Sequence, residues 1–153
     1  MRGVDVPLPT RLFSLREANA LLDTLREEFT RARELRDQLV DVQQKLSDAG
    51  RPLEGPDIQI DTDAPPAVQR LQAKAAVIFG KIRDVLRQVA ELGVEVKAAD
   101  GLVDFRSKLN GRTVYLCWKF GEERVTHWHE LDTGFAGRKP IPPESEFVGD
   151  LLH

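Results

Sequence analysis

The sequence predicts an α+β protein in which a long antiparallel helical hairpin, resembling a coiled coil, carries a small antiparallel β-sheet on its base. Two long segments repeat apolar residues in sevens, and after Gly93 this pattern gives way to strict alternation. Asn110–Gly111 then separates two alternating segments, which is a strong signal for a β-hairpin. The 153 residues fit one domain, 1–153, with a helical hairpin over 13–92, a sheet and glycine loop over 93–141, and a C-terminal tail over 142–153.

The composition limits which kinds of partner and which cellular location are expected. The net charge of −3 argues against general binding to nucleic acid, and no apolar run approaches the roughly 20 residues that span a bilayer. Hydrophobic residues make up 41% and charged residues 31%, which suits long solvated helices. The single cysteine, Cys117, excludes an internal disulfide. We therefore expect a cytoplasmic protein with neither a membrane nor a nucleic acid as partner.

The first helix is expected to begin after Ser14, whose side chain can form a capping box with Glu17. No glycine or proline follows until Gly50, which predicts about 35 helical residues, roughly 52 Å in length. Glu28 is the one polar residue in the heptad seam, either as a buried carboxylate reaching toward the sheet or as a side chain leaning to solvent. The seam comprises Ala18, Leu21, Leu25, Glu28, Ala32, Leu35, Leu39, Val42 and Leu46.

The second helix is expected to begin at Pro65–Pro66 and to end at Leu92, before Gly93. A short polar loop joins the two helices, so they should fold back on each other as an antiparallel pair. Heptad seams also suit a four-helix bundle made by two hairpins, and we expect a homodimer through the helical hairpin. The seam of the second helix comprises Val68, Leu71, Ala75, Ile78, Ile82, Val85, Val89 and Leu92.

The Asn110–Gly111 turn sets the register of the first β-hairpin. A two-residue turn at this point pairs Phe105 with Leu116 and Val103 with Trp118. Alternation then divides the side chains between two faces of the sheet. One face is apolar and should cover the helices, with Val103, Phe105, Val114, Leu116, Trp118 and Phe120, and the opposite face holds Asp104, Tyr115 and Cys117.

The next turn decides where two histidines lie. A two-residue turn at Gly121–Glu122 places His127 and His129 on the Trp118 face, toward the helices. A three-residue loop places them on the opposite face, beside Cys117, Tyr115 and Asp104. Glycine at the first turn position favours the two-residue turn, so the helix-facing arrangement is the prediction.

His127 and His129 stand two apart on a predicted strand, so their imidazoles point the same way, as in many zinc sites. The third ligand depends on the register, being Asp104 or Cys117 in one case and a helix acid such as Glu28 in the other. We take His127, His129 and Asp104 as the candidate ligands of a divalent metal such as zinc. The alternative is a pair of partly buried histidines satisfied by hydrogen bonds.

The segment T-G-F-A-G-R-K-P, residues 133–140, combines two glycines with adjacent basic residues. Glycines allow backbone N–H groups to approach a ligand, and Arg138 can pair with the oxygens of an anion. The predicted site for a small anionic ligand comprises His129, Glu130, Asp132, Gly134, Gly137 and Arg138, with the two acids holding the arginine when the site is empty. The alternative is a tight turn at the sheet edge with Phe135 in the core.

Four runs of the chain resemble a prokaryotic family of uncharacterised proteins, catalogued as domain of unknown function 2203. They are F-S-L-R-E-A-N-A-L-L at 13–22, G-L-V-D-F at 101–105, G-R-T-V-Y-L-C-W at 111–118, and W-H-E-L-D-T-G-F-A-G-R-K-P-I at 128–141. The resemblance spans nearly the whole chain and implies no particular activity. His127 occupies a position that the motif leaves unspecified, whereas the motif includes His129, Glu130, Gly134, Gly137 and Arg138.

The sequence therefore leaves three classes of function open. The first is a cytoplasmic binding or assembly protein with a ligand site at the sheet and its following loop. The second is a small metal-dependent hydrolase that uses His129 with Asp104 or Glu130. The third is a structural coiled-coil adaptor. No serine, cysteine or phosphate-loop catalytic motif decides whether the protein is an enzyme.

Overall fold

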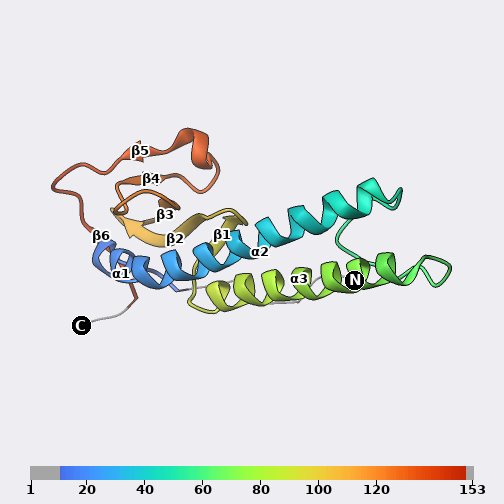
Figure 1. The fold of residues 1–153 in the computed structure, drawn as a ribbon. Coiled ribbons are helices and arrows are strands. Elements are labelled where there is room, and N and C mark those ends of the chain that lie inside the picture. The colour runs from blue at the N-terminus through green and yellow to red at the C-terminus, as the bar shows by residue number, and fades with distance from the viewer. Residues whose placement is uncertain (1–10, 151–153) are drawn as a thin grey trace. The chain divides into compact units, whose positions relative to one another are not determined.

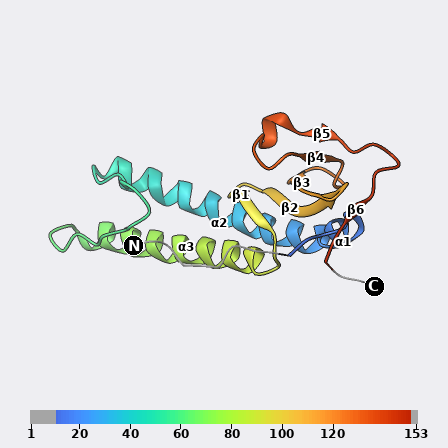
Figure 2. The same cartoon turned by 180° about the vertical axis from the view of Figure 1, so that it is seen from behind.

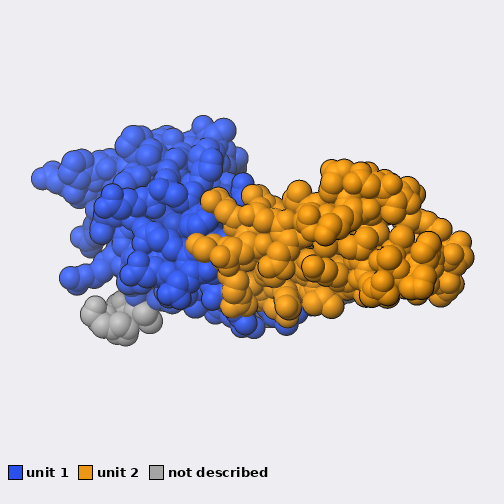
Figure 3. Space-filling model, viewed as in Figure 1, with its two compact units in different colours: residues 1–29, 86–153 blue, residues 30–85 orange. Residues whose placement is uncertain are grey.

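The computed structural model describes residues 11–150 and divides into two compact units (Figure 3). The first unit contains the chain up to Phe29 and from Leu86 onward, and the second runs from Thr30 to Val85. Residues 151–153 of the predicted tail lie outside the described residues.

The predicted first helix is present as two helices, α1 (Leu15–Ala20) and α2 (Leu22–Asp48). The capping box forms as expected, with the Glu17 N–H donating to Ser14 Oγ and the Ser14 N–H donating to Glu17 Oε1. The interruption is local, because the Leu21 N–H donates to the Ala18 oxygen three residues back. Heptad periodicity carries no signal for such a one-residue tightening.

The second helix, α3, spans Pro66–Ala90 and runs antiparallel to α2 (Figure 1 and, from behind, Figure 2). Within the Thr30–Val85 unit, the two helices share one apolar core, as the seams predict. Among residues 11–150, no helix combines the length and apolar composition that a membrane crossing requires. The buried members of this core are Ala32, Leu35, Leu39, Val42, Leu46, Ala64, Val68, Ala75, Ile78 and Val85.

Glu28, the fourth residue of the first-helix seam, lies in the other unit and follows neither of its two predicted alternatives completely. The residue is partly exposed, yet its Oε1 atom is buried and has no hydrogen-bond partner among residues 11–150. Phe29 beside it is buried and packs against Trp118, with ring centroids 6.4 Å apart. The aromatic ring therefore fills the space at this point of the seam.

Over residues 11–150 the sheet contains six strands, all paired antiparallel. Their order is β1-β2-β3-β4-β5, and β6 also pairs with β2. Asn110 and Gly111 both adopt positive φ angles, 52° and 81°, as a two-residue hairpin turn requires. The predicted register is confirmed, since Phe105 faces Leu116 and Val103 faces Trp118. The strands are β1 (Glu95–Ala98), β2 (Leu102–Leu109), β3 (Arg112–Lys119), β4 (His127–His129), β5 (Lys139–Pro140) and β6 (Phe147–Val148).

The apolar face of the sheet forms the core of the first unit with α1, the start of α2 and the end of α3, as predicted for the base of the hairpin. Trp118 and Phe105 are completely buried there. Phe120 is partly buried against the same core. This packing leaves the opposite face of the sheet, which we call the outer face, for polar side chains.

The predicted turn at Gly121–Glu122 is wrong. In the structure Trp128 pairs with Leu116 and Cys117 with His127, so both histidines lie on the outer face. The reason is a longer connection: β3 ends at Lys119 and β4 begins only at His127. Turn statistics for a short hairpin do not apply to a connection of this length.

The segment predicted as a tail contains strand β6, which pairs with the C-terminal half of β2. Phe147 is 4% exposed and belongs to the core of the first unit, where its ring lies 6.3 Å from that of Trp128. Beyond it, the Asp150 N–H donates to the Leu12 oxygen. A two-residue strand is too short to show alternation, which is why the sequence pattern did not reveal it.

Candidate metal centre on the outer face of the sheet

The outer face brings together Asp104 of β2, Cys117 of β3 and His129 of β4, which we call the trio. Their exposed fractions are 3%, 0% and 1%, although they face away from the hydrophobic core. Cys117 stands directly between Asp104 on one neighbouring strand and His127 on the other. One potential ligand atom from each member of the trio lies within 4.8 Å of the other two.

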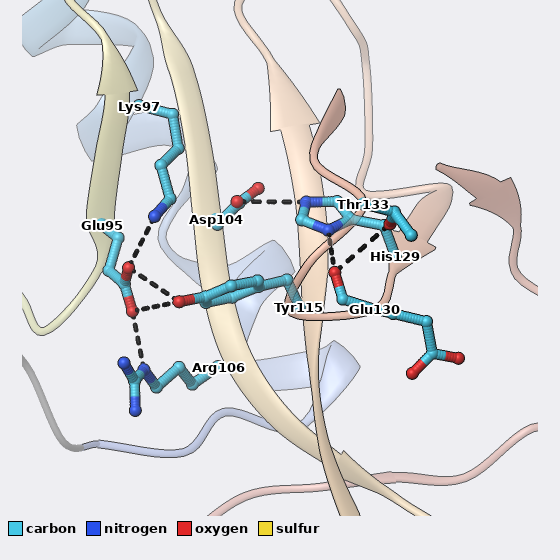
Figure 4. A network of polar contacts seen from close by, with 8 residues as sticks. All are labelled: Glu95, Lys97, Asp104, Arg106, Tyr115, His129, Glu130 and Thr133. Atoms are coloured by element: carbon cyan, nitrogen blue, oxygen red, sulfur yellow. Dashed lines mark hydrogen bonds and ion pairs between the residues drawn. The ribbon is translucent and has the colours of Figure 1, made fainter. Parts of the chain in front are cut away.

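His129 is held in one orientation by its backbone surroundings (Figure 4). Its Nδ1 lies 2.6 Å from the Glu130 carbonyl oxygen, which only accepts, so Nδ1 carries the proton. In the neutral imidazole, Nε2 then has a free lone pair, and it points at Asp104 Oδ2 over 3.1 Å. Metal-ligating histidines use the same arrangement, with one ring nitrogen donating to a carbonyl and the other binding the ion.

Asp104 is the buried acid of the trio. Burial raises the pKa of its carboxyl group above the ordinary value, although nearby His129 acts in the opposite direction. Its Oδ1 atom is buried and makes no hydrogen bond to any of residues 11–150. A buried carboxyl group 3.1 Å from an imidazole nitrogen needs either a proton between the two groups or a cation.

Cys117 completes the trio with a sulfur atom. Burial raises the pKa of its thiol to about 12, the negative charge of Asp104 adds to the effect, and the guanidinium of Arg138 opposes it. The residue is the only cysteine, so it cannot form a disulfide within the chain. A bound divalent cation would favour the thiolate, because metal ligation deprotonates the sulfur.

A second polar network lies beside the trio on the outer face (Figure 4). The Glu95 carboxylate accepts from Lys97 Nζ at 2.8 Å, from Arg106 Nε at 2.7 Å and from the Tyr115 hydroxyl at 2.9 Å. The Tyr115 ring in turn packs against the His129 ring, with centroids 5.3 Å apart. This network holds one side of the histidine in place.

Arg138, from the predicted anion site, lies near Cys117 of the trio. Its two terminal nitrogens donate to the Glu122 carboxylate at 3.0 and 2.5 Å, and its guanidinium stacks on the Phe135 ring at 4.3 Å. Glu130 and Asp132, the acids predicted to hold the arginine, do not: Glu130 pairs with Arg112 and Asp132 is exposed. The acid that pairs with Arg138 is instead Glu122, from the β3–β4 connection, whose path the sequence did not predict.

The two glycines of the segment 133–140, Gly134 and Gly137, are needed for its backbone turns. Gly134 has φ of 64°, a left-handed conformation that other residues adopt at a cost. A Cβ atom on Gly137 would lie 2.5 Å from Thr133 Cβ, so only glycine fits beside that threonine. The N–H groups of Gly137 and Arg138 donate to loop carbonyls in the same turn. Phe135 is 38% exposed and is therefore not in the core, contrary to the alternative interpretation.

His127, the other histidine proposed as a ligand, is partly exposed and lies outside the trio. Its Nδ1 lies 2.9 Å from the hydroxyl of Thr126. From the sequence, Asp104 and His129 belong to the candidate metal ligands, whereas Cys117 is only an alternative third ligand. The sequence did not reveal how β2, β3 and β4 pair. The long β3–β4 connection sets this pairing, and it places His129 on the same face as Asp104 and Cys117.

These features define an α+β protein with a buried Asp-Cys-His cluster on the outer face of a sheet. The chain matches the family described as Uncharacterized conserved protein (DUF2203) over residues 11–141, and it belongs to that family. The resemblance inferred from the sequence motifs is therefore confirmed. No curated protein and no solved structure matches the chain.

Proposed function

We propose that this protein is a binding protein whose ligand is a divalent metal ion, such as zinc. The ion would be held by Asp104, Cys117 and His129. One observation carries the proposal: His129 Nε2 and Asp104 Oδ2 lie 3.1 Å apart in a buried site, and the Cys117 sulfur belongs to the same cluster. Ligands at the usual zinc distances stand about 3.3 Å apart in a tetrahedral site. His129 Nε2 and Asp104 Oδ2 already stand near this spacing, and the Cys117 sulfur, within 4.8 Å of both, would move inward to bind the same ion.

The trio offers a carboxylate oxygen, a sulfur and an imidazole nitrogen, a donor set that suits zinc and related transition metals. With a thiolate and a carboxylate as ligands, the charge of a divalent ion is balanced. The hydrolase alternative would also require a general base beside the metal. Asp104 is itself a ligand in the proposed site, and the Glu130 carboxylate is paired with Arg112, so binding is the better proposal.

Metal content tests the proposal directly. The protein, purified without chelator and dialysed against Zn²⁺ or Co²⁺, is expected to retain one equivalent. Co²⁺ bound through Cys117 should show an intense near-ultraviolet absorption that Cys117→Ser removes. Replacing His129 with alanine should weaken binding by at least about 100-fold, beyond the range for residues that only support a ligand.

His127→Ala is the matched control, because it removes the same side chain from the same strand but leaves the trio intact. Its metal affinity should stay within about threefold of the native value, a free-energy difference below about 0.7 kcal/mol. Far-ultraviolet circular dichroism of each variant without metal verifies folding. Absence of stoichiometric metal in the folded native protein would overturn the proposal and leave a shared proton between His129 and Asp104 as the explanation.

Two further features remain proposals. A homodimer through coiled-coil pairing of the helical hairpin is supported by its heptad seams, and an assembly role would follow from it. A cytoplasmic location is supported by the single, reduced cysteine.

A further inference from the structure

Arg138 lies where it can act on whatever the trio binds. Its side chain is only 16% exposed and is fixed by the Phe135 ring on one side and the Glu122 carboxylate on the other. The pairing of β5 with β4, in which Lys139 faces Trp128, sets Arg138 beside the His129 end of β4. From there its guanidinium reaches the Cys117 side chain. A planar cation with two parallel donors therefore stands at the edge of the proposed metal centre.

The trio supplies three ligands, whereas zinc in proteins takes four. Within residues 11–150, the cluster contains no fourth histidine, cysteine, aspartate or glutamate. The fourth position is thus available to a group from solution. A negatively charged group there would lie near Arg138, which favours an anion over a neutral ligand.

Glu122 already presents two carboxylate oxygens to Arg138, as an external oxyanion would. Burial raises the pKa of Glu122, but its hydrogen bonds to Arg138 and to the backbone of Lys119 outweigh burial, and the net pKa is lowered. Its side chain is 25% exposed and comes from a surface turn, so a displaced Glu122 can reach water. Phe135 would hold the arginine in place during the exchange.

We propose that the bound metal takes an oxyanion, a carboxylate or a phosphate, as its fourth ligand, and that Arg138 binds this anion after exchanging it for Glu122. The inference rests on the proposed metal function. Arginine suits the role because its planar fork meets two oxygens at once. The metal would bind one oxygen of the anion, and Arg138 the others.

The opposing interpretation gives Glu122 and Arg138 a purely structural role. Glu122 does organise its turn, because its carboxylate accepts from the Lys119 N–H at 2.8 Å and its carbonyl accepts from Trp118 Nε1 at 2.9 Å. In that case an added anion would find no free donor. The two interpretations predict opposite effects of removing the Glu122 charge.

The test uses the cobalt-loaded full-length chain, titrated separately with inorganic phosphate and with acetate while the visible spectrum of the metal is recorded. We expect a saturable spectral change with at least one of the two anions, and the more effective one identifies the ligand class. Arg138→Ala should weaken the binding of that anion by at least about tenfold, equivalent to about 1.4 kcal/mol. Glu122→Gln should strengthen the binding of the anion, because the competing negative charge is gone.

Arg112→Ala is the matched control, since Arg112 also pairs with a glutamate through two nitrogens but does so with Glu130, outside the trio. It should bind the anion like the native protein. The proposal is overturned if neither anion changes the spectrum, if Arg112→Ala and Arg138→Ala lose affinity equally, or if Glu122→Gln does not tighten binding. Cobalt dialysis without anion shows separately whether the metal site itself exists, and Arg138→Ala must retain the metal.

Discussion

Trp118 provides the strongest test of which face of the sheet is turned to the core. Its side chain is completely buried in the core of the first unit. The ring lies 6.4 Å from that of Phe29 and 6.1 Å from that of Phe120, and Nε1 donates to the Glu122 carbonyl at 2.9 Å. Trp118→Ala would remove all these interactions and leave a cavity between sheet and helices.

The expected loss can be worked out from this burial. An aromatic side chain of this kind covers about 150–250 Å². At about 25 cal/mol per Å² that area corresponds to about 4–6 kcal/mol, and measured changes of Trp or Phe to alanine in cores are about 3–5 kcal/mol. We therefore expect the free energy of unfolding to fall by about 3–5 kcal/mol for Trp118→Ala. Urea denaturation followed by far-ultraviolet circular dichroism measures the difference.

Leu131→Ala is the matched control, because Leu131 is 51% exposed and its removal should change the free energy of unfolding by less than about 0.5 kcal/mol. Trp118→Phe keeps an aromatic ring but removes the donor to Glu122, so its effect should lie between the two. A loss below about 1 kcal/mol for Trp118→Ala would refute the assignment of the inner face.

Three further outcomes are expected. Burial alone would raise the pKa of Glu95, but its hydrogen bonds to Lys97, Arg106 and Tyr115 outweigh burial, and the pKa is lowered. The charged form therefore stabilises the fold above the ordinary pKa of about 4.3. Glu95→Gln should lower the free energy of unfolding by about 1–3 kcal/mol at pH 7 in urea melts. The difference between native and variant protein should shrink as the pH falls through the folded pKa, and a difference that stays constant with pH would contradict this prediction. In the metal-free protein at pH 8, Cys117 should react with a disulfide reagent at least about 100-fold more slowly than in urea, because burial raises its pKa to about 12. Equal rates would show an open thiol. Sedimentation equilibrium at tens of micromolar, about the range of weak dimers, should give a dimer, and a monomer would exclude pairing through the hairpin.

The two helices and the first β-hairpin could be predicted from the sequence because their determinants are local. Apolar residues in sevens mark the helix seams, and Ser14 with Glu17 forms its capping box within three residues. The Asn110–Gly111 turn needs two residues with positive φ, and it sets the whole β2–β3 register. Each of these signals lies within one or two turns of chain.

The outer face of the sheet was predictable only in part. Alternation placed Asp104 and Cys117 on one face, but the side on which His129 lies depends on the length of the β3–β4 connection, and the turn residues favoured the wrong length. Strand β6 and the pairing of Glu122 with Arg138 likewise join residues that are distant in the sequence. Nothing in the local pattern records such partners.

The sequence by itself determined the α+β class, the two long helical segments, the inner face of the sheet and the membership of the family. Only the tertiary structure decided that Asp104, Cys117 and His129 meet, and that Glu122 holds Arg138 beside them. The physical reason is the two-residue period of a strand: a shift of one residue in a connection moves every side chain of the next strand to the other face. A candidate site built from three strands therefore depends on every turn between them.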